Sequence, residues 1–120
     1  MRNRERNELM NEPKLTTVKV SLSDGGGIRV EPWIALIPKD GAGIKWETKD
    51  CSVKIRLNYP EHFSLSPSEA APTVTGLLAN GVRPGTYHYG IYVLGPDKDD
   101  VSHQRVAEIY TVDPDYKVDR

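Results

Sequence analysis

The segment RPGTYHYGIYVLG, residues 83–95, decides the fold class of this chain. Its Pro-Gly pair is a turn by composition, and bulky side chains then occupy every second position. Successive side chains of a β-strand point to opposite faces, so a period of two predicts one buried face. The predicted buried face holds Tyr87, Tyr89, Ile91 and Val93. The segment therefore predicts a core strand of a β-sheet.

The same alternation recurs along much of the chain. In TTVKVSLS, residues 16–23, the side chains of Val18, Val20 and Leu22 share one face. Further strands are expected at GIKWE (43–47), SVKIRLN (52–58), one short stretch near 73–77 in the otherwise loop-rich segment 58–81, and 104–112, with DPDYKVDR (113–120) closing the chain. This pattern is typical of half-buried strands separated by turns.

A second extended segment, GIRVEPWIALIP (27–38), is interrupted at Pro32. Proline cannot donate a hydrogen bond to a strand ladder. Pro32 therefore predicts a sheet edge, a bulge or a change of sheet.

Seven or eight strands with regular turns and no long helix predict an all-β fold. We expect an antiparallel Greek-key β-sandwich that forms a single domain over residues 15–120. Residues 1–14 mix Arg, Asn and Glu with few apolar positions, which predicts a flexible N-terminal tail.

Composition excludes several classes of function. A net charge of −1 gives no long-range field that would attract nucleic acid or an anionic membrane. No segment is long and apolar enough to span a bilayer, and the charged N-terminus holds no apolar run of signal-peptide length. A single cysteine excludes an intrachain disulfide. We expect a soluble cytoplasmic protein.

The order of the motifs resembles that of a cupredoxin-like domain over residues 15–118. The segments that carry the resemblance are GGGIRVEP, GAGIKWE, SVKIRL, PGTYHYGIYVLG and EIYTVDP. The Glu-Pro at 31–32 and the Asp-Pro at 113–114 also resemble a small bacterial family of unknown function that is named for such dipeptides.

GVRPGTYHY, residues 81–89, is also similar to a stretch of fibronectin type III domains, so a fibronectin type III or other immunoglobulin-like sandwich is the alternative. Both folds share one element. A tyrosine after a Pro-Gly turn can bond its hydroxyl back to the backbone at a tyrosine corner. Tyr87 is the candidate for this role.

The cupredoxin resemblance implies a position for each copper ligand. A type 1 site needs two imidazoles, a thiolate and usually a weak axial thioether. The resemblance places the first histidine at Cys51 or Ser52 and the thiolate at Ile91, and leaves His103 as the one imidazole in the following loop. Three of the four ligands are missing, so we expect no copper and no other cofactor.

The remaining candidates for metal binding or catalysis are Cys51, His62, His88 and His103. They show none of the spacings of known zinc motifs. We expect surface histidines, with His88 pointing outward, and a buried or half-buried cysteine. A non-standard ligand or metal site near Cys51, His62 and His103 stays open as an alternative. An enzyme that uses Cys51 is the least favoured class.

The tryptophans indicate an interaction role instead. Trp46 is in phase with Ile44 and is expected in the core. Trp33 follows the break at Pro32, and an exposed Trp33 beside Tyr59 or Tyr92 would form a binding patch. We therefore expect a non-catalytic module for protein interaction or assembly, with an unknown protein partner. Because the edge strands of sandwiches tend to pair, a homodimer is also expected.

Overall fold

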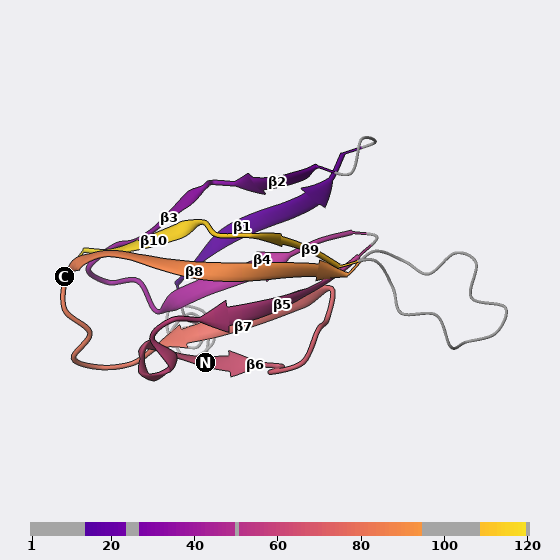
Figure 1. Ribbon diagram of the computed structural model, residues 1–120. Coiled ribbons are helices and arrows are strands. Elements are labelled where there is room, and N and C mark those ends of the chain that lie inside the picture. The colour runs from indigo at the N-terminus through magenta and orange to yellow at the C-terminus, as the bar shows by residue number, and fades with distance from the viewer. Residues whose placement is uncertain (1–13, 24–26, 50, 95–108, 120) are drawn as a thin grey trace, which may run out of the picture.

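A computed structural model describes residues 14–23, 27–49, 51–94 and 109–119 of the chain. Two mixed β-sheets form in these ranges (Figure 1). The first sheet has the strand order β2 (Ile28–Glu31), β1 (Leu15–Leu22), β4 (Gly43–Glu47), β7 (Thr73–Leu78) and β6 (Phe63–Ser66). The second has the order β3 (Ile34–Ile37), β10 (Asp115–Val118), β8 (Gly85–Leu94) and β5 (Ser52–Leu57), and β9 (Ile109–Val112) also pairs with β8.

The two sheets share one hydrophobic core, as the alternation predicts. Inward side chains of the first sheet are Val18, Val20, Val30, Ile44, Trp46, Phe63 and Val74, and those of the second are Ala35, Ile37, Val53, Ile55, Tyr89, Ile91, Val93, Tyr116 and Val118. The core face of β8 is confirmed, although Tyr87 at its start is half-buried rather than buried. Trp46 is fully buried, and His88 is exposed on the opposite face.

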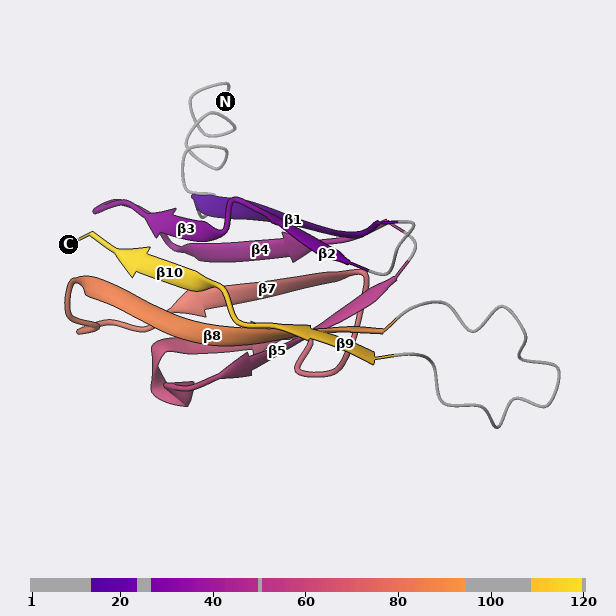
Figure 2. The same ribbon diagram turned by 45° about the horizontal axis from the view of Figure 1, so that its top comes forward.

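Pro32 marks a change of sheet. Strand β2 pairs with β1 in the first sheet, and after the bend at Pro32 and Trp33 the chain continues as β3, which pairs with β10 in the second sheet. Figure 2 shows β3 beside β10 at the edge of the second sheet. The crossing confirms the predicted change of sheet at Pro32. The predicted sheet edge is confirmed as well, because β2 and β3 each lie at the end of the strand order of their sheet.

The expectation of an antiparallel sandwich is confirmed only in part, because both sheets are mixed. Strand β1 pairs with β4 in parallel, and β3 pairs with β10 in parallel. The crossing at Pro32 explains why β1 and β4 are parallel. Strands β2 and β3 run in the same direction, opposite to β1, and the turn after β3 reverses the chain direction before β4. Strand β4 consequently enters the first sheet parallel to β1, on the side away from β2.

Two strands were not predicted. Segment 58–81 holds a short 3₁₀ helix η1 (Pro60–His62) and strand β6 in addition to the expected β7. The closing segment DPDYKVDR forms β10, between β3 and β8. Of the strand predicted at 104–112, the described part is β9, and the remainder lies outside the described residues, as does most of the predicted N-terminal tail.

Gly43 fixes the approach of β4 to β7. It has φ +154°, and a Cβ atom at this position would lie 1.9 Å from the carbonyl oxygen of Gly76 on β7. Because that space is occupied by backbone, no other residue fits there without separating the two strands.

Candidate interaction surface

The three residues predicted to form a patch do not meet. Trp33 lies in the bend between β2 and β3 and is 47% exposed. Tyr59 is 42% exposed and lies at the end of the sandwich, where its ring stacks on His62. Tyr92 is half-buried on β8, between Lys54 of β5 and Thr111 of β9. The structure thus places these side chains in three different surroundings.

Trp33 instead has two exposed apolar neighbours on β3. Ile34 is 49% exposed and Leu36 is 47% exposed, while Ala35 and Ile37 between and after them are fully buried. Because side chains alternate along a strand, Ile34 and Leu36 both point away from the core. We call Trp33, Ile34 and Leu36 the β3 strip.

Sequence reasoning missed Ile34 and Leu36 although a signal was present. Residues 33–37 read WIALI, so apolar side chains occupy both faces of the strand. A strand in a two-layer sandwich has only one core face, and the other normally carries polar residues. Five consecutive apolar residues at such a position therefore indicate an apolar outer face.

The outer face beside the β3 strip is charged. Asp115 on β10 is the register partner of Ile34 on one side and of His88 on the other, and a carboxylate oxygen of Asp115 bonds to Nδ1 of His88. Lys117 is the register partner of Leu36 and has no ion pair within the described part of the chain. Two apolar side chains thus lie next to one acidic and one basic residue.

One carbonyl group on the free edge of β3 is occupied by a side chain of β1. The hydroxyl of Thr16 on β1 donates a hydrogen bond of 2.6 Å to the carbonyl oxygen of Leu36. An unpaired edge is a template for an incoming strand, and a side chain that occupies its carbonyl groups weakens that template. The outward side chains of β3, rather than its edge, are therefore available to a partner.

Aromatic rings fill one end of the sandwich. Tyr87 donates a hydrogen bond of 2.7 Å to the carbonyl oxygen of Arg83, which confirms the predicted return bond of a tyrosine corner. The ring of Tyr87 also stacks against that of Tyr116 and meets His62 edge-on. This cluster holds the start of β8 to η1 and β10.

His62 is not the surface histidine that was expected. It is 8% exposed, and its Nδ1 lies 2.7 Å from the Tyr116 hydroxyl oxygen. The short helix η1 turns the ring inward, where the rings of Tyr59, Tyr87 and Tyr116 surround it. No periodic pattern indicates this burial, because His62 lies between strands.

Two buried tyrosines resist ionisation. Burial is the main cause that raises the pKa of Tyr89 and of Tyr116 above the ordinary value for tyrosine. Tyr89 accepts a hydrogen bond of 2.9 Å from the Trp46 indole nitrogen, which partly offsets the effect of burial. Both hydroxyls have partners inside the core, since Tyr89 bonds to Trp46 and Tyr116 lies beside His62.

The structure does not bring the predicted metal-site residues together. Cys51 comes directly before β5, whereas His62 lies in η1, which follows the other end of β5. The six-residue strand between them is about 20 Å long. Cys51 is half-buried and packs against the core. His88 is exposed on β8, and His103 lies outside the described residues. No group of three potential metal ligands occurs among the described residues.

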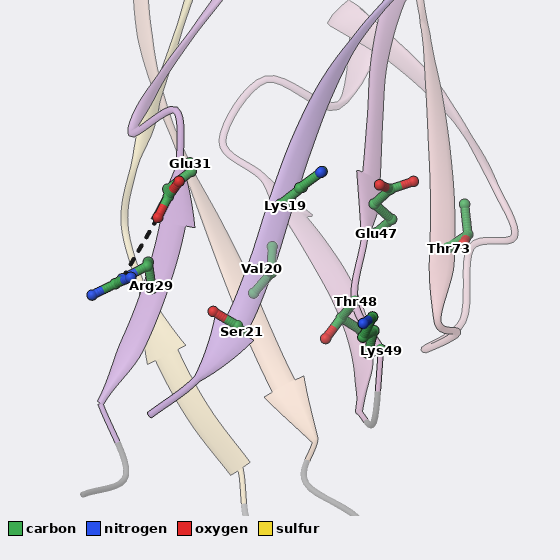
Figure 3. A pocket seen from close by; sticks show the side chains of 9 residues that line it. All are labelled: Lys19, Val20, Ser21, Arg29, Glu31, Glu47, Thr48, Lys49 and Thr73. Atoms are coloured by element: carbon green, nitrogen blue, oxygen red, sulfur yellow. Dashed lines mark ion pairs between the residues drawn. The ribbon is translucent and has the colours of Figure 1, made fainter. Parts of the chain in front are cut away.

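A groove of about 460 Å³ lies on the outer face of the first sheet (Figure 3). Lys19 on β1 has Glu31 of β2 and Glu47 of β4 as its register partners on either side. Lys49 and the hydroxyl-bearing Thr48 line the lower end in that view. Basic and acidic side chains alternate along the groove, so it favours neither an anion nor a cation. Such alternation is typical of a solvated sheet face.

Among the described residues, no helix has the length and apolar character needed to cross a membrane. In comparisons with known proteins, the chain matches no family model, no curated protein and no solved structure.

Proposed function

We propose that the chain is a non-catalytic β-sandwich module that binds another protein chain through the β3 strip. One observation carries this proposal: three large apolar residues within a four-residue stretch, Trp33, Ile34 and Leu36, are each nearly half exposed. Apolar residues that are exposed singly are ordinary, but a contiguous apolar patch with a polar rim is typical of interaction sites.

The energy available from the strip suits a specific but moderate contact. Complete burial of an Ile or Leu side chain gives about 1.5–3 kcal/mol, so covering the exposed half of each gives about 1 kcal/mol. A tryptophan offers a larger area and is enriched among residues that dominate binding energies. The polar residues on β10 and β8 would supply the rim.

The proposed framework for this module is a cupredoxin-like sandwich without a copper site. Its support is the placement of the segments that carry the resemblance. IRVE forms β2 and ends at the change of sheet, GIKWE forms β4 with Trp46 in the core, and GTYHYGIYVL forms the long strand β8. We place the module in the cytoplasm, where a chain with one cysteine loses no stabilising disulfide.

Site-specific photo-crosslinking tests the proposed function. A photoreactive phenylalanine analogue replaces Leu36 in the full chain, which is expressed in its native host and irradiated. The matched control carries the same analogue at Leu77, a leucine that is 45% exposed on the first sheet. We expect a discrete crosslinked protein product at position 36 and none at position 77.

The proposal would be wrong if neither position, or both positions equally, gave a product. In that case the β3 strip has no preferred protein partner in the cell.

A further inference from the structure

We infer that the partner of the β3 strip is a second copy of this chain, packed face to face and antiparallel across a two-fold axis. This inference rests on the proposed function, because it uses the same strip. It goes further by naming the occupant and the contacts that would specify it.

The outer face of β3 and β10 has two rows that alternate in character along the strands. One row holds Ile34 and Asp115, and the next holds Leu36 and Lys117. Within each row an apolar residue on β3 lies beside a charged residue on β10. The charge changes sign from the first row to the second.

This pattern is self-complementary under one operation. A two-fold axis that lies in the interface and crosses the strands between the rows, at the level of Ala35 and Tyr116, reverses the strand direction. It then sets β3 against β3 of the second copy, and β10 against β10. Ile34 faces Leu36 of the second copy, while Asp115 faces Lys117 of the second copy.

Both charged groups are able to make the new contact. One carboxylate oxygen of Asp115 bonds to His88, and the other, Oδ2, makes no hydrogen bond or ion pair with the residues that the structure describes. Lys117 is exposed, and no described carboxylate pairs with it. The dimer would therefore gain two equivalent ion pairs beside a closed apolar contact, without breaking a described ion pair.

The partly occupied edge of β3 supports packing by faces. Thr16 occupies the Leu36 carbonyl, so a continuous sheet through two β3 edges would first have to displace β1 side chains. Face-to-face packing leaves this hydrogen bond intact. A second copy also carries an apolar strip of the same area. An unrelated partner would need a separate apolar surface of matching size.

Charge exchange tests the inference by sedimentation equilibrium of the full chain. The variants are Lys117→Asp, Asp115→Lys and the double variant that carries both changes. Lys54→Asp on β5, an exposed lysine of the same sheet, is the control. Circular dichroism checks that each variant is folded, and Lys117→Asp leaves the bond between Asp115 and His88 in place.

We expect the unchanged chain to dimerise reversibly and each single reversal to raise the dissociation constant about tenfold or more, because like charges then face each other twice. The double variant should return to within about threefold of the unchanged chain, and Lys54→Asp should have no effect of that size. A chain that stays monomeric up to about 1 mM, or a double variant that fails to recover, would overturn the inference. Crosslinking of Leu36 to a different protein, together with a monomeric chain, would overturn the second copy but retain the proposed function.

Discussion

Nδ1 of the His62 ring and the hydroxyl oxygen of Tyr116 lie 2.7 Å apart inside the aromatic end of the sandwich. This bond connects η1 to β10, and the two residues that make it are 54 positions apart in the chain. Because η1 follows β5 and β10 is the last strand, the bond joins the middle of the described chain to its C-terminal end.

Removing the Tyr116 hydroxyl should therefore destabilise the fold. In Tyr116→Phe the ring packing is retained, but Nδ1 of His62 loses its partner in a buried site. An unpaired buried polar group costs about 1–3 kcal/mol, and we expect the free energy of unfolding to fall by that amount in urea titrations. Tyr92→Phe is the control, because no described group bonds to the Tyr92 hydroxyl, and it should change stability by less than about 0.5 kcal/mol. Equal losses in the two variants would contradict this role for the bond.

Stability should also decline in alkaline solution. Burial raises the pKa of Tyr89 and of Tyr116, and the nearby Tyr87, Tyr59 and Glu61 add to the effect at Tyr116. Above about pH 10 the unfolded chain loses these two protons while the folded chain keeps them, so the free energy of unfolding falls as pH rises. This contribution is fully present below about pH 10 and is lost as the pH rises towards the folded-state pKa values.

The slope should approach about 1.4 kcal/mol per pH unit for each of the two tyrosines. Urea midpoints between about pH 8 and about pH 11 measure it, and tyrosinate absorbance shows how many tyrosine hydroxyls ionise before unfolding. If every tyrosine ionised in the folded protein near pH 10, the assignment of Tyr89 and Tyr116 as buried acids would fail.

Gly43→Ala should be more damaging than a general glycine substitution. The new Cβ would meet the Gly76 carbonyl oxygen at 1.9 Å, so β4 and β7 would have to separate. We expect a loss of more than about 3 kcal/mol or failure to fold. Gly81→Ala is the matched control, because Gly81 has φ +85° but nothing within 4 Å of the added atom, and about 1–2 kcal/mol is expected there. Thermal unfolding of both variants decides between a backbone clash and a simple conformational cost.

Substitutions of two isoleucines on β3 should distinguish effects on folding stability from effects on association. Ile37 is fully buried and Ile34 is 49% exposed, although they are three residues apart. Ile37→Ala should cost about 2–5 kcal/mol of stability, whereas Ile34→Ala should cost about 1 kcal/mol or less at concentrations where the chain is monomeric. Only Ile34→Ala is expected to weaken association in a protein that remains folded. A large loss of monomer stability in Ile34→Ala would place Ile34 in the core instead of on the interaction surface.

Local patterns in the sequence predicted the core more accurately than the pairing of strands. The alternation at Val18 and Val20 and along β8 identifies inward side chains, because burial on one face imposes a period of two. The parallel partners of β1 and β3 are distant in sequence, and no local pattern encodes them. Strand β10 was not predicted, because only two apolar residues, Tyr116 and Val118, alternate in an otherwise charged segment. Its position between β3 and β8 depends on contacts with strands that are distant in sequence.

The residues of the candidate interaction surface were predicted only in part. Trp33 is exposed beside the break at Pro32, in agreement with the hypothesis, but Tyr59 and Tyr92 lie elsewhere. Their assignment relied on residue type alone, and exposure depends on neighbours that the sequence does not name. The burial of His62 was missed for the same reason, because the rings that cover it come from η1, β8 and β10.

Concentration-dependent nuclear magnetic resonance of the isotope-labelled full chain tests the central claim most directly. Backbone amide signals are followed from about 20 µM to about 1 mM protein. We predict progressive shifts at Trp33, Ile34, Leu36 and Lys117, with Leu77 and Thr17 on the opposite sheet unchanged. Shifts that are centred on β1 and β7, or none over the whole range, would contradict an interaction surface on β3 that joins two copies of the chain.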